Sequence, residues 1–177
     1  NNPLSPVGHV AGHIKELGQG VQHVASRVKD LVALVTFANA RREATGEGLA
    51  FLDVPRAYYG RIPGPAALAE KAGVAEDAAA AALAVLRRTR SVDKAGVVDV
   101  DGDRTAMAAA LAAAGIGEAE GLAGAALAFR YSALTALLGD ALTEKDYVAI
   151  VRNRVLVDVQ GGDVLLQLFT KPVMQAG

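Results

Sequence analysis

The sequence predicts an α+β fold in which a small unit of strands and one helix is interrupted by an alanine-rich helical insertion. Strands are indicated by runs of β-branched residues, above all the two runs that flank Gln160 to Asp163. The insertion is indicated by a change of amino-acid composition between Ile62 and Asp140, where alanine replaces larger aliphatic residues. Aromatic residues make up only 5% of the chain although 52% is hydrophobic, which favours abundant helix with small side chains.

The first part of the chain predicts the order strand, helix, strand. Asn1 to Gly18 is expected to be an extended lead-in with one helical turn near its end, and Gly20 to Val28 is expected to be the first strand. Leu31 to Ala40 follows as a helix, because apolar residues recur there at helical spacing. Asn39 to Gly48 predicts a loop, and Phe51 to Val54 predicts a second strand that a proline closes.

The insertion predicts a series of helices. Pro65 should begin the first helix and Gly73 should end it. The further helices are expected over Ala75 to Arg88, Thr105 to Ala114 and Glu118 to Leu138. Between them, Asp99, Asp101 and Asp103 are spaced like the start of a calcium loop, but Arg104 stands where the turn glycine belongs, so a solvated turn is the better interpretation.

A helix and a hairpin are expected to complete the fold. Thr143 to Arg152 has Thr143 as its N-cap and Asp146 in the capping-box position. Val155 to Val159 and Val164 to Thr170 should pair as a β-hairpin, since the two intervening glycines allow the positive φ of a tight turn. Alternation along the second arm places Leu166 and Leu168 on one face and Gln167 and Phe169 on the other.

The charge balance disfavours nucleic acid as a partner. The chain carries 18 basic and 19 acidic residues, for a net charge of −1, so no general field attracts a polyanion. There is no cysteine, which excludes disulfides and thiolate chemistry. The most membrane-like window, Leu122 to Leu138, is interrupted by Arg130 and is rich in alanine, so we expect a buried or subunit-facing helix and membrane contact only indirectly.

Several separate blocks, in the right order, resemble the last module of the 4-hydroxyphenylpyruvate dioxygenases. These blocks are Gly-Val-Gln-His-Val-Ala from Gly20, Phe-Leu-Asp-Val-Pro-Arg-Ala-Tyr-Tyr from Phe51, Val-Leu-Val-Asp from Val155, and Leu-Leu-Gln-Leu-Phe-Thr-Lys-Pro-Val from Leu165. The resemblance implies a vicinal-oxygen-chelate (glyoxalase/dioxygenase-like) fold with an incomplete βαβββ module. That module would comprise residues 1–61 and 141–177, and residues 62–140 would be the helical insertion.

The resemblance also implies candidate site residues. In that family, two histidines and one glutamate hold non-haem Fe(II) beside an α-keto acid. His23 is similar to the second histidine, Gln22 and Gln167 to glutamines of the substrate pocket, and Phe169 to an aromatic residue that packs on ligands. Asn1 is similar to a pocket asparagine. The first histidine would belong to a preceding module, and the glutamate to a strand beyond the end of this sequence, so one ligand of three is present.

Two hypotheses follow. In the first, the chain is a non-catalytic, dioxygenase-like structural or accessory subunit without a cofactor, and its partners are other protein subunits of a larger assembly. An organellar membrane assembly, photosynthetic or respiratory, reached after removal of a targeting peptide, would fit an N-terminal Asn. In the second, these residues belong to a longer Fe(II)-dependent dioxygenase of the 4-hydroxyphenylpyruvate type, which the retained Gln22, His23, Gln167 and Phe169 would favour.

Overall fold

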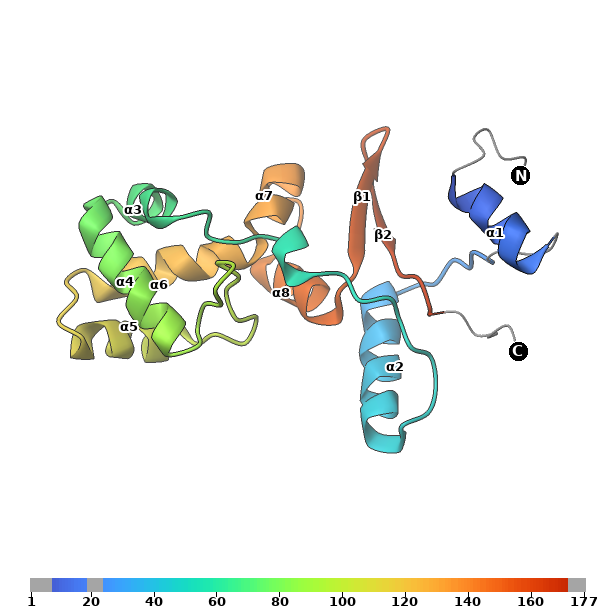
Figure 1. Cartoon of the computed structure of the whole chain (residues 1–177), viewed down its shortest axis with the longest axis horizontal. Coiled ribbons are helices and arrows are strands. Elements are labelled where there is room, and N and C mark those ends of the chain that lie inside the picture. Colours follow the sequence, from blue (N-terminus) through green and yellow to red (C-terminus); the bar gives the residue numbers. More distant parts are fainter. Residues whose placement is uncertain (1–7, 19–23, 172–177) are drawn as a thin grey trace.

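The structure, a computed structural model, describes residues 8–18 and 24–171 and shows an α+β fold (Figure 1). Its strands are β1 (Leu156–Gln160) and β2 (Asp163–Gln167), which form one antiparallel sheet. Its short 3₁₀ helices are η1 (Arg56–Tyr58) and η2 (Phe129–Tyr131). The α-helices among the described residues are α1 (His9–Leu17), α2 (Leu31–Thr45), α3 (Pro65–Ala72), α4 (Glu76–Arg88), α5 (Arg104–Ala113), α6 (Ala119–Ala128), α7 (Ser132–Leu138) and α8 (Glu144–Asn153).

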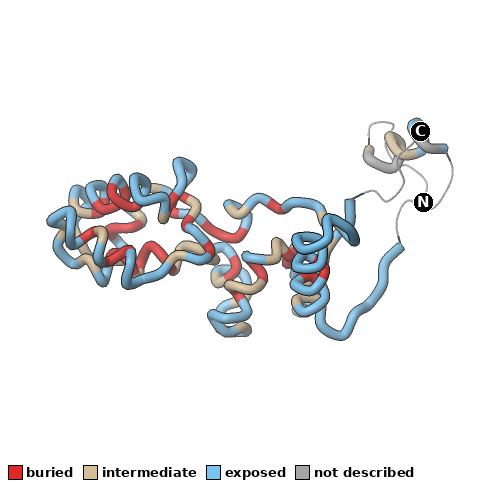
Figure 2. Tube along the Cα trace, turned by 90° about the horizontal axis from the view of Figure 1, so that it is seen from below, coloured by how far each residue is buried: buried red, intermediate tan, exposed pale blue. Residues whose placement is uncertain are grey.

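One apolar core lies among the insertion helices α3, α4, α5 and α6, which we call the helical lobe. Alanines such as Ala79, Ala82, Ala123 and Ala126 are fully buried there, because small side chains let neighbouring helices approach closely. Leucines fill the space between the helices, for example Leu111, which is also fully buried. This packing explains how a segment poor in large residues still makes a core, seen at one end of the molecule in Figure 2.

A second core joins α2, α7, α8 and the base of the hairpin, which together with η1 we call the hairpin lobe (Figure 1). Its fully or almost fully buried members include Val35 of α2, Leu134 of α7, Ile150 of α8 and Val155 just before β1. Tyr59, directly after η1, is completely buried in the same cluster. Residues from both sides of the insertion therefore share one core.

The segment α6–η2–α7 runs from the helical lobe to the hairpin lobe. Over its 20 residues, Ala119–Leu138, it is long and apolar enough to cross a membrane by length and composition. Three of its leucines lie inside the protein, Leu122 and Leu127 in one core and Leu134 in the other, whereas Leu137 is 52% exposed. The core helix of a water-soluble domain passes the same test, and this segment contributes residues to both apolar cores.

Most of the expected local structure is confirmed. The hairpin pairs Gln160 with Asp163 around a two-residue turn, and α3 begins at Pro65 and ends at Gly73, whose φ of 68° is left-handed. The helices expected within the insertion form, with the last one divided by η2. At α8 the capping box is complete, with the side chains of Thr143 and Asp146 each accepting a hydrogen bond from the other's backbone N–H.

Four expectations are wrong. The extended lead-in with one helical turn, expected over Asn1 to Gly18, is instead helical over the nine residues His9–Leu17. The first strand, expected over Gly20 to Val28, is not formed over its described part, residues 24–28, where no neighbouring strand pairs with the extended chain. The second strand is reduced to one bridge, Phe51 with Thr170, because β2 ends at Gln167. The loop expected from Asn39 is helical as far as Thr45, since alanine, arginine and glutamate are good helix formers.

Candidate functional site

The hairpin has one strongly apolar face. The register pairs Val157 with Leu166 and Val159 with Val164, so these four side chains lie on the same side of the two strands. Val157 is buried at the base of the hairpin, whereas Val159 and Val164 near the turn are exposed. The face is therefore packed against the core at its base and uncovered at its tip, which projects from the molecule in Figure 1.

A segment from before the insertion extends the hairpin. The backbone N–H of Leu52 donates to the carbonyl of Phe169 at 2.7 Å, and that of Lys171 donates to the carbonyl of Ala50 at 2.7 Å. The hydroxyl of Tyr58 also donates to the carbonyl of Val157 at 2.8 Å. Residues on the two sides of the insertion are thereby joined by backbone pairing as well as by the shared core.

The structure places two of the site residues suggested by the resemblance. Gln167 is half-buried at the end of β2, opposite Leu156, and Phe169 follows it with 44% of its surface exposed. Asn1, Gln22 and His23 lie outside the described residues. The structure thus brings Gln167 and Phe169 to one end of the hairpin, and their relation to His23 stays a prediction.

No metal centre is found among the described residues. Within residues 8–18 and 24–171, no three histidine, cysteine, aspartate or glutamate side chains form a group that could hold an ion. The histidine suggested as a ligand, His23, is not among those residues.

Exposed large apolar side chains are concentrated on the hairpin lobe and the chain leading into it. Phe37 of α2 is 66% exposed, and Val24 before that helix is 83% exposed. We call the exposed apolar residues of α2, the segment that follows it and the hairpin the hairpin surface; they are Leu34, Phe37, Leu49, Leu52, Val159, Val164, Leu165 and Phe169. Every residue from 59 to 136 is described, and none of the large apolar side chains in that stretch is exposed.

The sequence pattern of α2 contained a signal for this surface. Residues Leu31, Leu34, Val35 and Ala38 recur at the spacing of a core-facing stripe. Val35 and Ala38 are buried, whereas Leu34, at the edge of the stripe, is 39% exposed. Phe37 does not belong to that stripe. When α2 packs against the core through the stripe, the phenylalanine ring is therefore turned towards solvent. A large aromatic residue off the apolar stripe is the feature that indicates a contact surface.

The junction between the two lobes is polar. Arg130 of η2 is only 9% exposed, and its guanidinium donates to the carbonyls of Leu127 at 3.2 Å and Val100 at 3.1 Å and to the carboxylate of Glu144 at 3.2 Å. The neighbouring Tyr131 stacks on Tyr147 with ring centroids 5.2 Å apart. Burial, followed by the charge of Glu144, raises the pKa of Tyr131. Arg130 thus connects the helical lobe to the first turn of α8.

Tyr59 is a buried hydroxyl without a partner. Its side chain is fully buried and its Oη makes no hydrogen bond among the described residues. Desolvation, with a smaller contribution from neighbouring Tyr58, raises the pKa of Tyr59 far above its ordinary value, so the phenol stays neutral. A neutral, enclosed phenol in a packed core is a structural group rather than a proton-transfer group.

Searches of protein-family models, curated proteins and solved structures found no match to this chain.

Proposed function

We propose that this chain is a non-catalytic, dioxygenase-like accessory subunit whose hairpin surface docks against another protein subunit of a larger assembly. The observation that carries the proposal is the uneven distribution of exposed apolar side chains, which gather on the hairpin lobe and are absent from residues 59–136. Isolated exposed apolar residues are common on proteins, but a group of them on one part of a fold is typical of an interaction site.

The energetics favour a partner that covers Phe37 and the hairpin tip. Burying a phenylalanine, leucine or valine side chain contributes about 1.5–3 kcal/mol relative to leaving it in water. Phe37 is 66% exposed, and Val159 and Val164 form a cross-strand pair with no covering layer near the turn. A partner that covers several of these side chains would gain part of this free energy from each, so we place the centre of contact on the hairpin surface.

The arrangement of the hairpin lobe supports a module interrupted by an insertion. Helix α2, the paired segment at Phe51 and the hairpin β1–β2 occur in the order expected of a βαβββ unit after its first strand. We propose that residues 1–61 and 141–177 form this vicinal-oxygen-chelate module and that residues 62–140 are the insertion. Helices α3, α4, α5 and α6 of the insertion have an apolar core of their own, as expected for a segment added to an existing unit, while Val100 and Leu134 of the insertion join the core of the hairpin lobe.

The experiment measures the native mass of the full-length protein in its source cells. Light scattering after size-exclusion chromatography should give a mass well above the 18.1 kDa of the chain. Phe37→Glu should release the chain from the assembly, because a buried unpaired carboxylate opposes docking. Leu137→Glu is the matched control: Leu137 is 52% exposed on α7, outside the hairpin surface, so its variant should remain assembled.

Three outcomes separate the hypotheses. Loss of assembly in Phe37→Glu alone, with the helical circular dichroism of the free chain unchanged, supports the docking role. Equal behaviour of the two variants contradicts it. Stoichiometric iron in the native full-length protein, with arylpyruvate-dependent consumption of dioxygen, would replace the accessory role with an Fe(II)-dependent dioxygenase of the 4-hydroxyphenylpyruvate type.

A further inference from the structure

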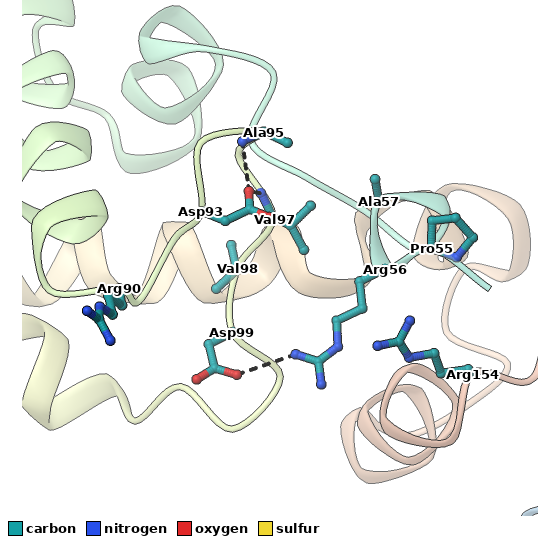
Figure 3. A pocket seen from close by; sticks show the side chains of 10 residues that line it. All are labelled: Pro55, Arg56, Ala57, Arg90, Asp93, Ala95, Val97, Val98, Asp99 and Arg154. Atoms are coloured by element: carbon teal, nitrogen blue, oxygen red, sulfur yellow. Dashed lines mark hydrogen bonds and ion pairs between the residues drawn. The ribbon is translucent and has the colours of Figure 1, made fainter. Parts of the chain in front are cut away.

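The cavity at the junction of the two lobes, a hollow of about 460 Å³, has charged groups that the chain itself already engages (Figure 3). Arg56 pairs with Asp99, with 3.6 Å between Nη1 and Oδ1. Arg154 pairs with Asp53 and donates to the carbonyl of Val54 at 3.1 Å. These two arginines therefore hold neighbouring segments of the fold together.

Backbone groups without a partner lie instead along one edge of the hairpin. The two glycines of its turn have φ values of 59° and 93°, as in a two-residue turn that the hydrogen-bonded pair of Gln160 and Asp163 closes. Hydrogen-bonded pairs alternate with non-hydrogen-bonded pairs along an antiparallel ladder. In β2 the backbone groups of odd-numbered residues therefore face β1, and those of even-numbered residues face away from it.

The chain directly after β2 keeps this alternation. The carbonyl of Phe169 accepts from Leu52 and the N–H of Lys171 donates to Ala50, both at 2.7 Å, so the odd-numbered residues again have partners. The even-numbered residues have no partner for their backbone N–H and carbonyl groups among the described residues. We call these groups the β2 edge; they belong to Val164, Leu166, Leu168 and Thr170.

The opposite edge of the hairpin is occupied by side chains. The outward carbonyl of Val157 accepts from the hydroxyl of Tyr58 at 2.8 Å. The outward N–H of Val159 donates to the carboxylate of Asp158 at 2.9 Å. A row of unpaired N–H and carbonyl groups is a template for a further strand, so the β2 edge is the side of the hairpin that is open to pairing.

We propose that the β2 edge pairs antiparallel with the β2 edge of a second copy of this chain, which joins two two-stranded sheets across a two-fold axis. One register makes the edge self-complementary. When Gln167 lies opposite the partner's Gln167, Asp163 lies opposite the partner's Lys171 and Leu165 lies opposite the partner's Phe169. The even-numbered residues then meet as hydrogen-bonded pairs, Val164 with the partner's Thr170 and Leu166 with the partner's Leu168.

The side chains of the edge favour a second copy as the occupant. Asp163 and Lys171 are exposed and belong to no ion pair among the described residues. Their separation along an extended chain is about 26 Å, at about 3.3 Å per residue, so they cannot pair within one chain. Leu165 and Phe169 are 42% and 44% exposed, and each would cover the other across the two-fold axis.

This pairing is distinct from docking at the hairpin surface and does not rest on it. An antiparallel contact of one edge with itself closes at two copies, because the same groups are used on both sides. The second copy would cover Leu165 and Phe169, whereas Phe37 of α2 does not belong to the β2 edge and would remain for another subunit.

Sedimentation equilibrium of the isolated full chain tests the proposal. The mass of the parent should rise with concentration to twice the 18.1 kDa of the chain. Asp163→Lys and Lys171→Glu should each weaken the dimer about tenfold or more, because like charges then lie opposite each other at two symmetry-related places. An equimolar mixture of these two variants should dimerise as tightly as the parent, since each mixed dimer has two pairs of unlike charge.

Asp140→Lys, at an exposed residue after α7, is the control with the same change in net charge. It should dimerise as the parent does. Mixed dimers of Asp140→Lys with Lys171→Glu should form less readily than those of Asp163→Lys with Lys171→Glu, because Asp163 of the control chain would lie opposite the introduced glutamate. This comparison separates pairing in the stated register from general attraction between chains of different charge.

Two results would overturn the proposal. One is a chain that stays monomeric up to about 1 mM. The other is a dimer that the charge reversals do not weaken, or that mixing Asp163→Lys with Lys171→Glu does not restore, since its contact would lie elsewhere. Because the measurement contains no other subunit, either result leaves the docking of the hairpin surface in the native assembly unaffected, and release of Phe37→Glu from that assembly is measured separately.

Discussion

The close contact at Gly60 gives the sharpest test of how the two lobes are joined. A Cβ atom at Gly60 would lie 2.3 Å from the carbonyl oxygen of Phe129 and 2.6 Å from the backbone nitrogen of Ser132. Both are backbone atoms, so they cannot rotate away as a flexible side chain would. Ala133 N–H donates to the carbonyl of Tyr59 at 2.9 Å in the same place, which ties the two segments together.

The expected cost of Gly60→Ala follows from these contacts. Overpacking in a close-packed region costs about 1–3 kcal/mol. If the segments separate to admit the methyl group, the backbone hydrogen bond from Ala133 to Tyr59 weakens, and that adds about 0.5–1.5 kcal/mol. We therefore expect the free energy of unfolding to fall by roughly 2–4 kcal/mol, or by about 4–16 °C in melting temperature for a chain of this size.

Thermal and urea unfolding, followed by circular dichroism of the helices, measure this effect. Gly121→Ala in α6 is the matched control, because no atom lies within 4 Å of a Cβ added there. An exposed helical position of this kind should gain about 0.5–1 kcal/mol on the change from glycine to alanine. Stability of Gly60→Ala equal to or above that of the parent would refute the close approach of Gly60 to η2 and α7.

Three further changes test the remaining local arguments. Arg130→Met should lower the free energy of unfolding by about 2–3 kcal/mol, because the carbonyls of Leu127 and Val100 lose their buried guanidinium donor. Arg104→Met, at an exposed ion pair, should lower it by less than about 1 kcal/mol. Chemical denaturation of the two variants measures this difference. Hydrogen bonds from Thr143 lower the pKa of Asp146, so the contribution of this carboxylate to stability is complete above its unfolded pKa of about 3.9 and is lost as pH falls through the lower folded pKa. Asp146→Asn should therefore make the urea midpoint less dependent on pH between about 5 and 3. An unchanged pH dependence would contradict the capping role. Gly162→Ala, at a φ of 93°, should destabilise the hairpin by about 1 kcal/mol, seen as faster amide exchange in β1 and β2, and exchange no faster than in the parent would argue against the positive-φ turn.

Features that depend on local chemistry could be read from the sequence. The hairpin was predictable because Gly161 and Gly162 supply two successive positive φ values between β-branched runs. The start of α3 at Pro65 and the capping box at Thr143 were predictable for the same reason, since each signal lies within four residues of the element it begins. These elements need no knowledge of distant parts of the chain.

Features that depend on distant neighbours could not be read in this way. The β-branched run at residues 24–28 has strand propensity, yet a strand exists only where a second one pairs with it, and the described residues offer no partner. The cavity at the junction brings Arg56, Arg90 and Arg154 together from segments 34 and 98 residues from Arg56 in the sequence. Nothing near any one of these arginines indicates the other two, so only the fold reveals that they line one hollow.

The exposure of Phe37 could be predicted from the sequence only in part. Val35 and Ala38 define the core-facing side of α2, and the position of Phe37 off that side is visible in the sequence. That Phe37 is left 66% exposed by the described parts of the chain is visible only in the structure. The prediction of a partner protein therefore gains its location, the hairpin surface, from the fold.

Amide hydrogen exchange, compared between the isolated chain and the native assembly, tests the docking role most directly. The account predicts slower exchange in the assembly at α2 and at the hairpin tip around Val159 and Val164. Exchange in α3, α4, α5 and α6 should be unchanged, because the large apolar side chains of these helices already pack in the core of the helical lobe. Slower exchange at the insertion helices alone, with the hairpin surface unchanged, would contradict it and place the contact on the insertion.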